Sequence, residues 1–402
     1  MKLSPLLILA IALTIISLGV AQKASIDGVI SQMTLEEKVS QLMMVGFSGK
    51  SISAELRAEI LAHPPCGIAL MGYNVDTPTQ VAQLCNTLQE IASQTKAQIP
   101  LFIATDQEGG PVNRLKNGFT KFPANNILSS IDSRKKAEEL ARKAGEVIAI
   151  ELSAVGVNMN LAPVLDVYTG PQNDSIMQKR SFGNKPEVVS RLGVAYIQGL
   201  QGKGVIATAK HFPGHGGATQ DSHFHLPTVN GTKDELQNVH LKPFKEAIQR
   251  ADVSAIMTAH IVYPAYDKAV PATLSPKILT QLLRKEMNFQ GVIITDDLKM
   301  EAIKQYFDIG LAAVMAIKAG ADIVLPLATT PEQQHVYNAL LEAAENGEIS
   351  EERLNESVRR ILNLKAKMNL FKRRYVKLEN LRKLVGTKAH KDVAREIVYY
   401  AK

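Results

Sequence analysis

The chain has 402 residues, of which 46% are hydrophobic and 21% are charged. This composition is sufficient for a large apolar core and excludes a chain that is disordered throughout. The formal net charge is +7, but lysines and arginines are scattered along the sequence except near residues 372–374, so a nucleic-acid-binding surface is not expected.

Residues 1–21 are typical of a signal peptide. Lys2 precedes an apolar run over residues 6–20, and the small residues Gly19 and Ala21 stand where a signal peptidase cleaves. We therefore expect a protein that is periplasmic or secreted. The alternative is an uncleaved membrane anchor, which would be the protein's one contact with a membrane, because no other stretch reaches the ~18 apolar residues of a spanning helix.

Eight short apolar runs are expected to form β-strands. They cover residues 43–47, 67–71, 100–105, 158–162, 205–210, 254–258, 291–295 and 322–325. These runs are rich in Val and Ile and lack strict alternation of apolar and polar residues. Such a pattern is typical of strands that are covered on both faces of a sheet.

Amphipathic segments with helix start and stop signals lie between these strands. Thr77 with Pro78, Ser275 with Pro276, and Thr330 with Pro331 suit the N-cap and first helical positions, Thr232 with Glu235 matches a capping box, and Gly156 and Gly320 suit left-handed C-caps. The alternation predicts an α/β fold, a (β/α)8 TIM barrel over residues 22–371 as the single catalytic domain, followed by a short helical tail over 372–402. A doubly wound open sheet is the alternative.

Charged and imidazole side chains gather after the predicted strands. The third strand leads into Asp106, Glu108 and Arg114, the fourth into Asp166, the fifth into Lys210, His211, His215, Asp221 and His223, the sixth into His260, and the seventh into Asp296 and Asp297. Because the carboxyl ends of barrel strands form the catalytic face, this polarity indicates an enzyme. No glycine-rich phosphate-binding motif follows a strand, so no nucleotide or other cofactor is expected.

Asp296 directly follows a predicted apolar strand, and its carboxylate would project into the barrel mouth. An ionised carboxylate there can attack a carbon electrophile if cations lie nearby. The alternative is a structural role, as a helix N-cap or in an ion pair, for which Asp297 is the better candidate.

Asp221 and His223 are two residues apart in a glycine-rich segment. The carboxylate can orient the imidazole and raise its pKa, and such a histidine can both give and take a proton. The alternative for the histidine is a solvent-exposed position. The histidine spacing between 211 and 225 matches no zinc motif, so no metal is expected. Cys66 and Cys85 could form a disulfide or remain as two buried thiols.

These motifs together resemble glycoside hydrolase family 3, in its bacterial β-N-acetylglucosaminidase branch. The resemblance covers roughly residues 26–371 and is carried by Met33 to Lys38, Asp106 to Gly110, Ala162 to Asp166, Arg180 to Gly183, Lys210 to Gly216, Asp221 to His223 and Thr295 to Leu298. The Lys-His-Phe-Pro-Gly-His-Gly segment followed by Asp-Ser-His is specific to that branch.

The resemblance implies roles for individual residues. Asp296 would be the nucleophile and His223 the acid/base with Asp221 as its dyad partner, while Asp106, Arg114, Arg180, Lys210 and His211 would bind the sugar. The mechanism would be double displacement with retention of configuration. Two departures stand out. Pro111 replaces a common arginine, and residues 390–396 resemble the start of a second domain that does not follow here.

The resemblance thus predicts an exo-acting β-N-acetylglucosaminidase that acts on peptidoglycan fragments or chitin-type oligosaccharides. A carbohydrate is the expected partner, and the chain is expected to be a monomer. The alternatives are a broader β-glycosidase or a glycoside phosphorylase with the same site, and a non-catalytic sugar-binding barrel. The last would be expected to lack Asp296 or His223, and both are present.

Overall fold

Eight parallel strands form one sheet that closes on itself. The computed structural model describes residues 26–170, 175–218, 225–327 and 329–401. The strands are β1 (Met44–Val45), β2 (Gly67–Leu70), β3 (Phe102–Thr105), β6 (Met159–Asn160), β7 (Ile206–Phe212), β8 (Ala255–Thr258), β9 (Val292–Asp297) and β10 (Ile323–Leu325), and they pair in this order. A parallel bridge between Met43 and Val324 joins the first strand to the last. The predicted (β/α)8 barrel is therefore confirmed, and the open sheet is wrong.

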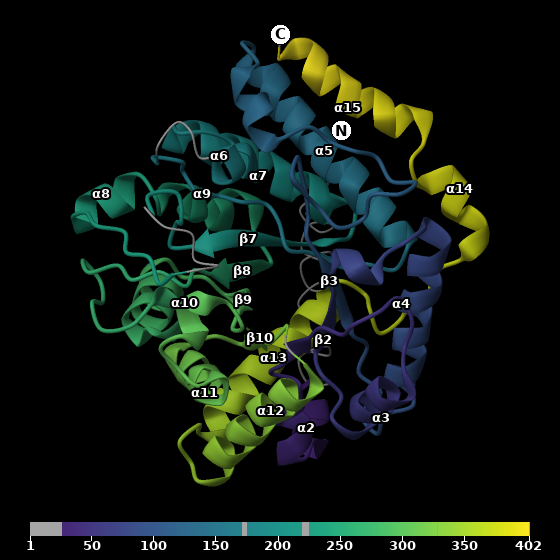
Figure 1. The fold of residues 1–402 in the computed structure, drawn as a ribbon, viewed down its shortest axis with the longest axis vertical. Helices are drawn as coiled ribbons and strands as arrows, with labels where there is room; N and C mark the ends of the chain where they lie inside the picture. The colour runs from purple at the N-terminus through teal and green to yellow at the C-terminus, as the bar shows by residue number, and fades with distance from the viewer. Residues whose placement is uncertain (1–25, 171–174, 219–224, 328, 402) are drawn as a thin grey trace, which may run out of the picture.

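Helices surround the strands (Figure 1). They are α2 (Leu35–Ser40), α3 (Ala54–Ala62), α4 (Pro78–Ser93), α5 (Arg134–Ala154), α6 (Ser175–Arg180), α7 (Pro186–Gly202), α8 (Lys233–Asn238), α9 (Lys242–Ala251), a π-helix (Lys277–Glu286), α10 (Glu301–Lys304), α11 (Ile309–Ala319), α12 (Thr330–Glu345), α13 (Glu351–Lys367), α14 (Leu381–Leu384) and α15 (Lys388–Tyr400). No helix in the described ranges has both the length and the apolar content that a membrane crossing requires.

Most of the predicted helix signals lie where they were expected. Thr77 caps α4, and Thr232 forms a capping box with Glu235 at the start of α8. The Ser275 hydroxyl accepts the Ile278 N–H at 3.3 Å, Ser275 has an extended backbone, and Pro276 already has helical backbone angles, as predicted for an N-cap and the residue after it. Both predicted C-cap glycines, Gly156 and Gly320, have positive φ.

The predicted N-cap of α12 is wrong by one residue. Thr329, not Thr330, has the extended backbone of an N-cap. The reason is the position of Glu332, three residues after Thr329, whose carboxylate accepts the Thr329 N–H at 2.9 Å and closes a capping box.

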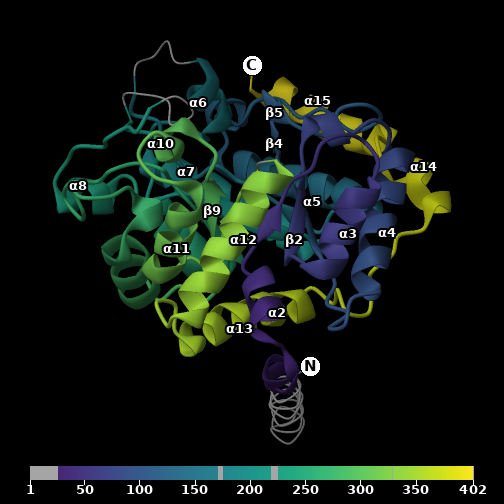
Figure 2. The same cartoon turned by 60° about the horizontal axis from the view of Figure 1, so that its bottom comes forward.

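The barrel interior and the helix-facing shell are separate parts of the core. In β8, Ala255 and Met257 point into the barrel while Ile256 packs with the surrounding helices, as the period of two requires. Helix α13 crosses the amino end of the barrel and contributes Ile361 and Leu364 to the interior cluster (Figure 2). Helix α13 thus covers part of the amino end of the barrel.

The two cysteines are free and buried. Cys66 belongs to the barrel interior, whereas Cys85 lies on α4 in the outer shell. Of the two possibilities that the sequence left open, the structure has the two buried thiols.

The C-terminal tail packs on α5. The carboxylate of Glu151 in α5 accepts hydrogen bonds from Thr120, from the Gly386 N–H at 2.9 Å and from His390 Nδ1 at 2.8 Å. Glu151 is 4% exposed. The predicted helical segment after residue 372 is therefore fixed to the barrel by a buried carboxylate, with α14 and α15 lying outside α4 and α5 (Figure 1).

We predict that Glu151→Ala lowers the free energy of unfolding by about 2–4 kcal/mol, because it leaves several buried donors without an acceptor. Turnover should be retained, since no proposed catalytic group lies in the tail. Thermal unfolding and kcat measure the two effects. Glu138→Ala, a more exposed position on the same helix, is the control and should change stability little. A folded but inactive Glu151→Ala protein would contradict the separation of the tail from the chemistry.

Lys365 in α13 is a fully buried lysine below the barrel. Its Nζ donates to Gln41 Oε1 at 3.1 Å and lies 4.9 Å from the centre of the Phe102 ring. Burial lowers the pKa of this ammonium group to about 7 from the usual 10.5. Between these values the unfolded chain binds one proton more than the folded chain, so this group makes the free energy of unfolding rise with pH.

Lys365→Met removes this dependence on pH. The difference in unfolding free energy, variant minus wild type, should fall by about 1.4 kcal/mol per pH unit above pH 7, and should be constant below it. Urea unfolding between about pH 6 and about pH 9 measures it. Lys367→Met, on the same helix but with a side chain 55% exposed, is the control and should give a flat difference. A flat difference for Lys365→Met as well would show that Lys365 is charged throughout this range.

Candidate active site

The carboxyl ends of the strands present most of the predicted site residues on one face. Asp106 directly follows β3, Lys210 and His211 lie in the last part of β7, and Asp296 lies near the end of β9. Strands β7 and β9 extend two residues beyond their predicted ends, which brings His211 and Asp296 into the strands themselves. The barrel geometry therefore brings side chains from distant parts of the sequence to the same mouth.

A short hairpin after β3 was not expected from the sequence. Its strands are β4 (Gln107–Gly109) and β5 (Val112–Asn113), and they are antiparallel. Gly109 and Gly110 have φ of 100° and 61°, a backbone region that glycine adopts without strain. The hairpin returns the chain so that Arg114 N–H donates to the Asp106 carbonyl at 3.1 Å. Pro111, which stands where the family commonly has an arginine, is exposed in the turn. The contacts described below do not involve this position.

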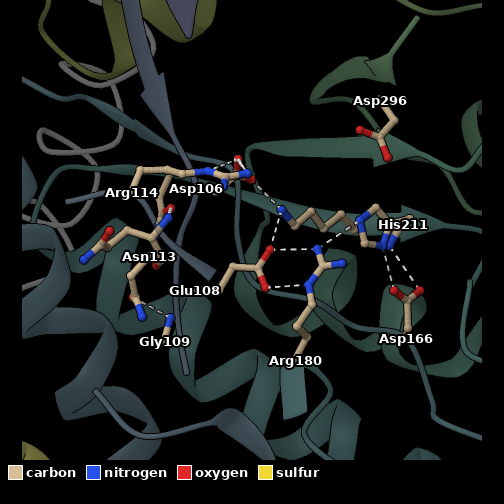
Figure 3. Close-up of polar contacts among 12 residues, drawn as sticks. Asp106, Glu108, Gly109, Asn113, Arg114, Asp166, Arg180, His211 and Asp296 are labelled. Atoms are coloured by element: carbon tan, nitrogen blue, oxygen red, sulfur yellow. Dashed lines mark hydrogen bonds and ion pairs between the residues drawn. The ribbon is translucent and has the colours of Figure 1, made fainter. Parts of the chain in front are cut away.

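The site is built around a chain of alternating charges (Figure 3). Arg114 Nη2 lies 3.2 Å from Asp106 Oδ2, and Lys210 Nζ lies 2.7 Å from Asp106 Oδ1. The same Lys210 Nζ lies 2.7 Å from Glu108 Oε1. Arg180, the last residue of α6, makes two hydrogen bonds to Glu108, at 2.9 and 2.8 Å. Each cation thus shares a carboxylate with its neighbour, which fixes the geometry of all five groups.

Side-chain exposure falls along this chain from Arg114 to Glu108, and the last group, Arg180, is slightly more exposed than Glu108. It is 34% for Arg114, 14% for Asp106, 10% for Arg180, 3% for Lys210 and 0% for Glu108. Arg114 and Asp106 therefore face the mouth, and Glu108 is the buried counter-ion behind them. Burial raises the pKa of Glu108, but Arg180 and Lys210 outweigh it and bring the value to about 2.

His211 is held by a second buried carboxylate, Asp166. His211 Nδ1 lies 2.7 Å from Asp166 Oδ2, and Asp166 Oδ1 accepts the backbone N–H groups of His211 and His215 at 3.1 and 2.6 Å. Burial raises the pKa of Asp166, but His211 and the N–H of His215 outweigh it and bring the value to about 2. The carboxylate thus remains ionised and anchors the segment from Lys210 to His215.

Asp296 lies beside these groups and is only partly covered. Its Oδ1 accepts the Asp297 N–H at 2.8 Å. Burial raises the pKa of Asp296, but its neighbours His211 and His260, the Asp297 N–H and Lys210 together hold it below its usual value. The side chain is therefore an anion at neutral pH, as nucleophilic attack requires.

Asp297 makes contacts that stabilise the fold. Its Oδ1 accepts the Lys299 and Leu327 N–H groups, both at 3.0 Å, and this joins the end of β9 to the segment after β10. Burial, with a smaller contribution from Asp296, raises the pKa of Asp297 to about 6. The Nε2 atom of His260 lies 3.0 Å from the carbonyl oxygen of Asp297. His260 is 1% exposed and packs beside the nucleophile candidate.

The structure brings together six of the eight predicted site residues: Asp106, Arg114, Arg180, Lys210, His211 and Asp296. Asp221 and His223 lie outside the described residues, so the dyad stays a prediction. Sequence reasoning gave no role to Glu108, Asp166 or His260. All three had been noted among the side chains that follow predicted strands, and the first two also belong to the motifs that carry the family resemblance.

The structure describes a part of the chain that leaves out Asp221 and His223. In this part of the chain no group of three or more His, Cys, Asp or Glu side chains is placed to hold a metal ion.

Comparisons with known proteins agree with this geometry. The family model described as the glycosyl hydrolase family 3 N terminal domain matches residues 34–364. "Beta-hexosaminidase A" of Pseudoalteromonas piscicida is 35% identical over 369 residues, a match that covers 84% of this chain and 62% of that relative. The chain thus spans less than two thirds of the length of this relative.

Two solved structures show the same similarity. A glycoside hydrolase family 3 β-N-acetylglucosaminidase from Paenibacillus sp. str. FPU-7 has a TM-score of 0.86 and 42% identity, and the match covers 92% of this chain and 69% of that one. NagZ from Neisseria gonorrhoeae, solved in complex with N-trifluoroacetyl-D-glucosamine, has a TM-score of 0.72 and 30% identity, with 90% and 98% covered. On the family match, the fold and the arrangement of the site, this chain belongs to glycosyl hydrolase family 3.

Proposed function

We propose that this protein is an exo-acting, retaining β-N-acetylglucosaminidase that hydrolyses terminal β-linked N-acetylglucosamine. The observation that carries the proposal is the position of the ionised Asp296, at the end of β9 beside His211 and Lys210. The relatives named for β-hexosaminidase and β-N-acetylglucosaminidase activity support it. We further propose that the natural substrates are peptidoglycan fragments or chitin-type oligosaccharides.

The terminal sugar binds against the chain of charges. Asp106 accepts hydrogen bonds from hydroxyl groups, and Arg114, Arg180, Lys210 and His211 supply donors. These donors and acceptors are already fixed by Glu108 and Asp166, so little ordering is needed when the sugar binds. Asp296 then attacks the anomeric carbon and forms a glycosyl ester, while the departing oxygen takes a proton from His223.

In the second step water attacks the same carbon and releases Asp296. His223 takes the proton from this water and returns to its starting state. Asp221 orients the imidazole, and neither step uses a cofactor. In this proposal the enzyme is exported by its signal segment and acts as a monomer on a carbohydrate, without nucleic acid.

One assay tests the activity directly. The purified protein should hydrolyse an aryl β-N-acetylglucosaminide far faster than the matching aryl β-glucoside, and NMR should show the β-anomer of the sugar as the first product. A preference for the glucoside would contradict the proposed substrate, and turnover that requires phosphate would indicate phosphorolysis instead of hydrolysis.

Asp296→Ala is expected to lower kcat by at least about 10³-fold, because it removes the nucleophile. The side chain lies at the partly exposed mouth, so the free energy of unfolding should change little. Asp252→Ala, an exposed aspartate at the opposite end of the barrel, is the matched control and should keep full activity. If Asp296→Ala kept even about a tenth of the wild-type kcat, the assignment of the nucleophile would be wrong.

His223→Ala should slow glycosides with poor leaving groups by about 10²–10⁴-fold, and those with activated aryl leaving groups much less. Activated leaving groups depart without a proton, but hydrolysis of the glycosyl-enzyme still needs a base. Added azide should therefore restore turnover and yield a β-glycosyl azide. Asp221→Ala should show the same pattern more mildly, since the imidazole remains.

The measurement is kcat for the variant across a series of aryl leaving groups. A histidine that only binds substrate would raise KM for good and poor leaving groups alike. An equal loss at every leaving-group pKa, without rescue by azide, would show that His223 is not the acid/base.

A further inference from the structure

Tyr73 is an exposed aromatic side chain at the carboxyl end of β2. Residues Leu70 of β2 and Thr105 of β3 are partners in the parallel sheet, so the turn after β2 lies next to Asp106, the residue after Thr105. Tyr73 is in this turn, in the short 3-10 helix Gly72–Asn74. Its side chain is 53% exposed. A large aromatic surface therefore stands in contact with solvent on the catalytic face of the barrel.

The backbone that carries Tyr73 is held by its neighbour. Asn74 is completely buried. Its side-chain amide donates to the carbonyls of Phe47 and Gly49 at 2.9 and 2.7 Å, and its Oδ1 accepts the Met71 N–H at 2.8 Å. The turn is thus tied to the segment after β1, and the position of Tyr73 does not depend on burial of its own ring. A ring on such a turn loses little conformational freedom when a ligand packs on it.

The electrostatic surroundings of Tyr73 agree with a position over the mouth. Partial burial and the charge of Asp297 raise the pKa of Tyr73, and Arg114 acts in the opposite direction. Arg114 follows β5 on one side of the mouth, and Asp297 ends β9 on the other. The phenol of Tyr73 therefore lies close enough to interact electrostatically with both Arg114 and Asp297.

The mouth has a deep region of mostly buried side chains and a rim that is exposed to solvent. The groups proposed to bind the terminal sugar are mostly buried, with Lys210 3% and Arg180 10% exposed in their side chains. In an exo-acting enzyme the released sugar occupies the deep end, and the leaving group points toward solvent. An exposed aromatic ring at the rim meets the leaving group and not the sugar that is released.

We propose that Tyr73 is the platform for the leaving-group sugar, with its ring packed against the C–H groups of a pyranose in the subsite that follows the scissile bond. The proposal rests on the proposed glycosidase function and adds a preference for substrates with a sugar ring in that subsite. The negative face of an aromatic ring attracts polarised C–H groups, and their packing removes apolar area from water.

The test compares two substrates that share the terminal sugar. In N,N′-diacetylchitobiose the leaving group is a sugar ring, and in methyl β-N-acetylglucosaminide it is methanol. For Tyr73→Ala, the ratio of kcat/KM on the disaccharide to kcat/KM on the methyl glycoside should fall by about tenfold, a typical loss when an aromatic side chain in a binding site is truncated. Tyr73→Phe should keep the ratio, since the ring remains.

The matched control is Tyr375→Ala, which removes a tyrosine of similar exposure, 54%, in the tail. It should leave the ratio and both activities unchanged. An unchanged ratio for Tyr73→Ala, or an equal loss on both substrates, would overturn the assignment of Tyr73. A wild-type protein that hydrolyses neither substrate would instead overturn the glycosidase function on which the proposal rests.

Discussion

The burial of Glu108 constrains the whole mouth of the barrel. A carboxylate that is removed from water without partners costs several kcal/mol, so the fold must supply cations to it. Lys210 lies in β7, and Arg180 is the last residue of α6. The Arg180 carbonyl accepts a hydrogen bond from the Asn125 side-chain amide at 3.0 Å, and this contact fixes the end of α6. Two segments that are distant in the sequence, β7 and α6, are therefore locked to the β4–β5 hairpin by one anion.

This constraint also bears on the proposed function, in which charged groups of the candidate site bind a neutral sugar. The ammonium group of Lys210 contacts the carboxylates of both Glu108 and Asp106, so neither Lys210 nor Asp106 carries an uncompensated charge. Asp106 nevertheless remains partly exposed, and a carboxylate has more lone pairs than its two cations use. Hydroxyl groups can bind there without rearrangement of the site. His211, His260 and Lys210 meanwhile help to hold the pKa of the nucleophile candidate below its usual value.

The sequence predicted the barrel well because its strands are buried on both faces and therefore consist of apolar runs that local patterns reveal. All eight were located, with errors of a few residues at their ends. The β4–β5 hairpin was missed because its strands are short and polar and look like a loop. Local chemistry also decided the N-cap of α12, where Glu332 selects Thr329 and not the adjacent Thr330.

Local sequence patterns predicted the candidate site less well than the barrel. The contacts of Glu108 with Arg180 and of Lys210 with Asp106 join residues 72 and 104 positions apart, and no spacing rule predicts such pairs. The family resemblance supplied the substrate-binding residues, but Glu108 and Asp166 make their contribution through those residues. Their role follows only from the three-dimensional contacts. The dyad of Asp221 and His223 lies outside the described residues and rests on the sequence.

A second buried charge cluster, at the opposite end of the barrel, contrasts with the candidate site at the mouth. Asp322 begins the segment of β10 and is fully buried. It accepts from Arg284, from Arg360 at 3.0 Å, from Ser357 at 2.8 Å and from the Ile293 N–H at 2.9 Å. Every direction around this carboxylate is occupied by protein, so it can only hold α13 and the π-helix against the strands. At the mouth, Asp106 and Asp296 instead keep part of their surface accessible. Both ends contain buried anions with arginine partners, and unused hydrogen-bonding capacity at an accessible surface is what separates a binding site from a structural ion cluster.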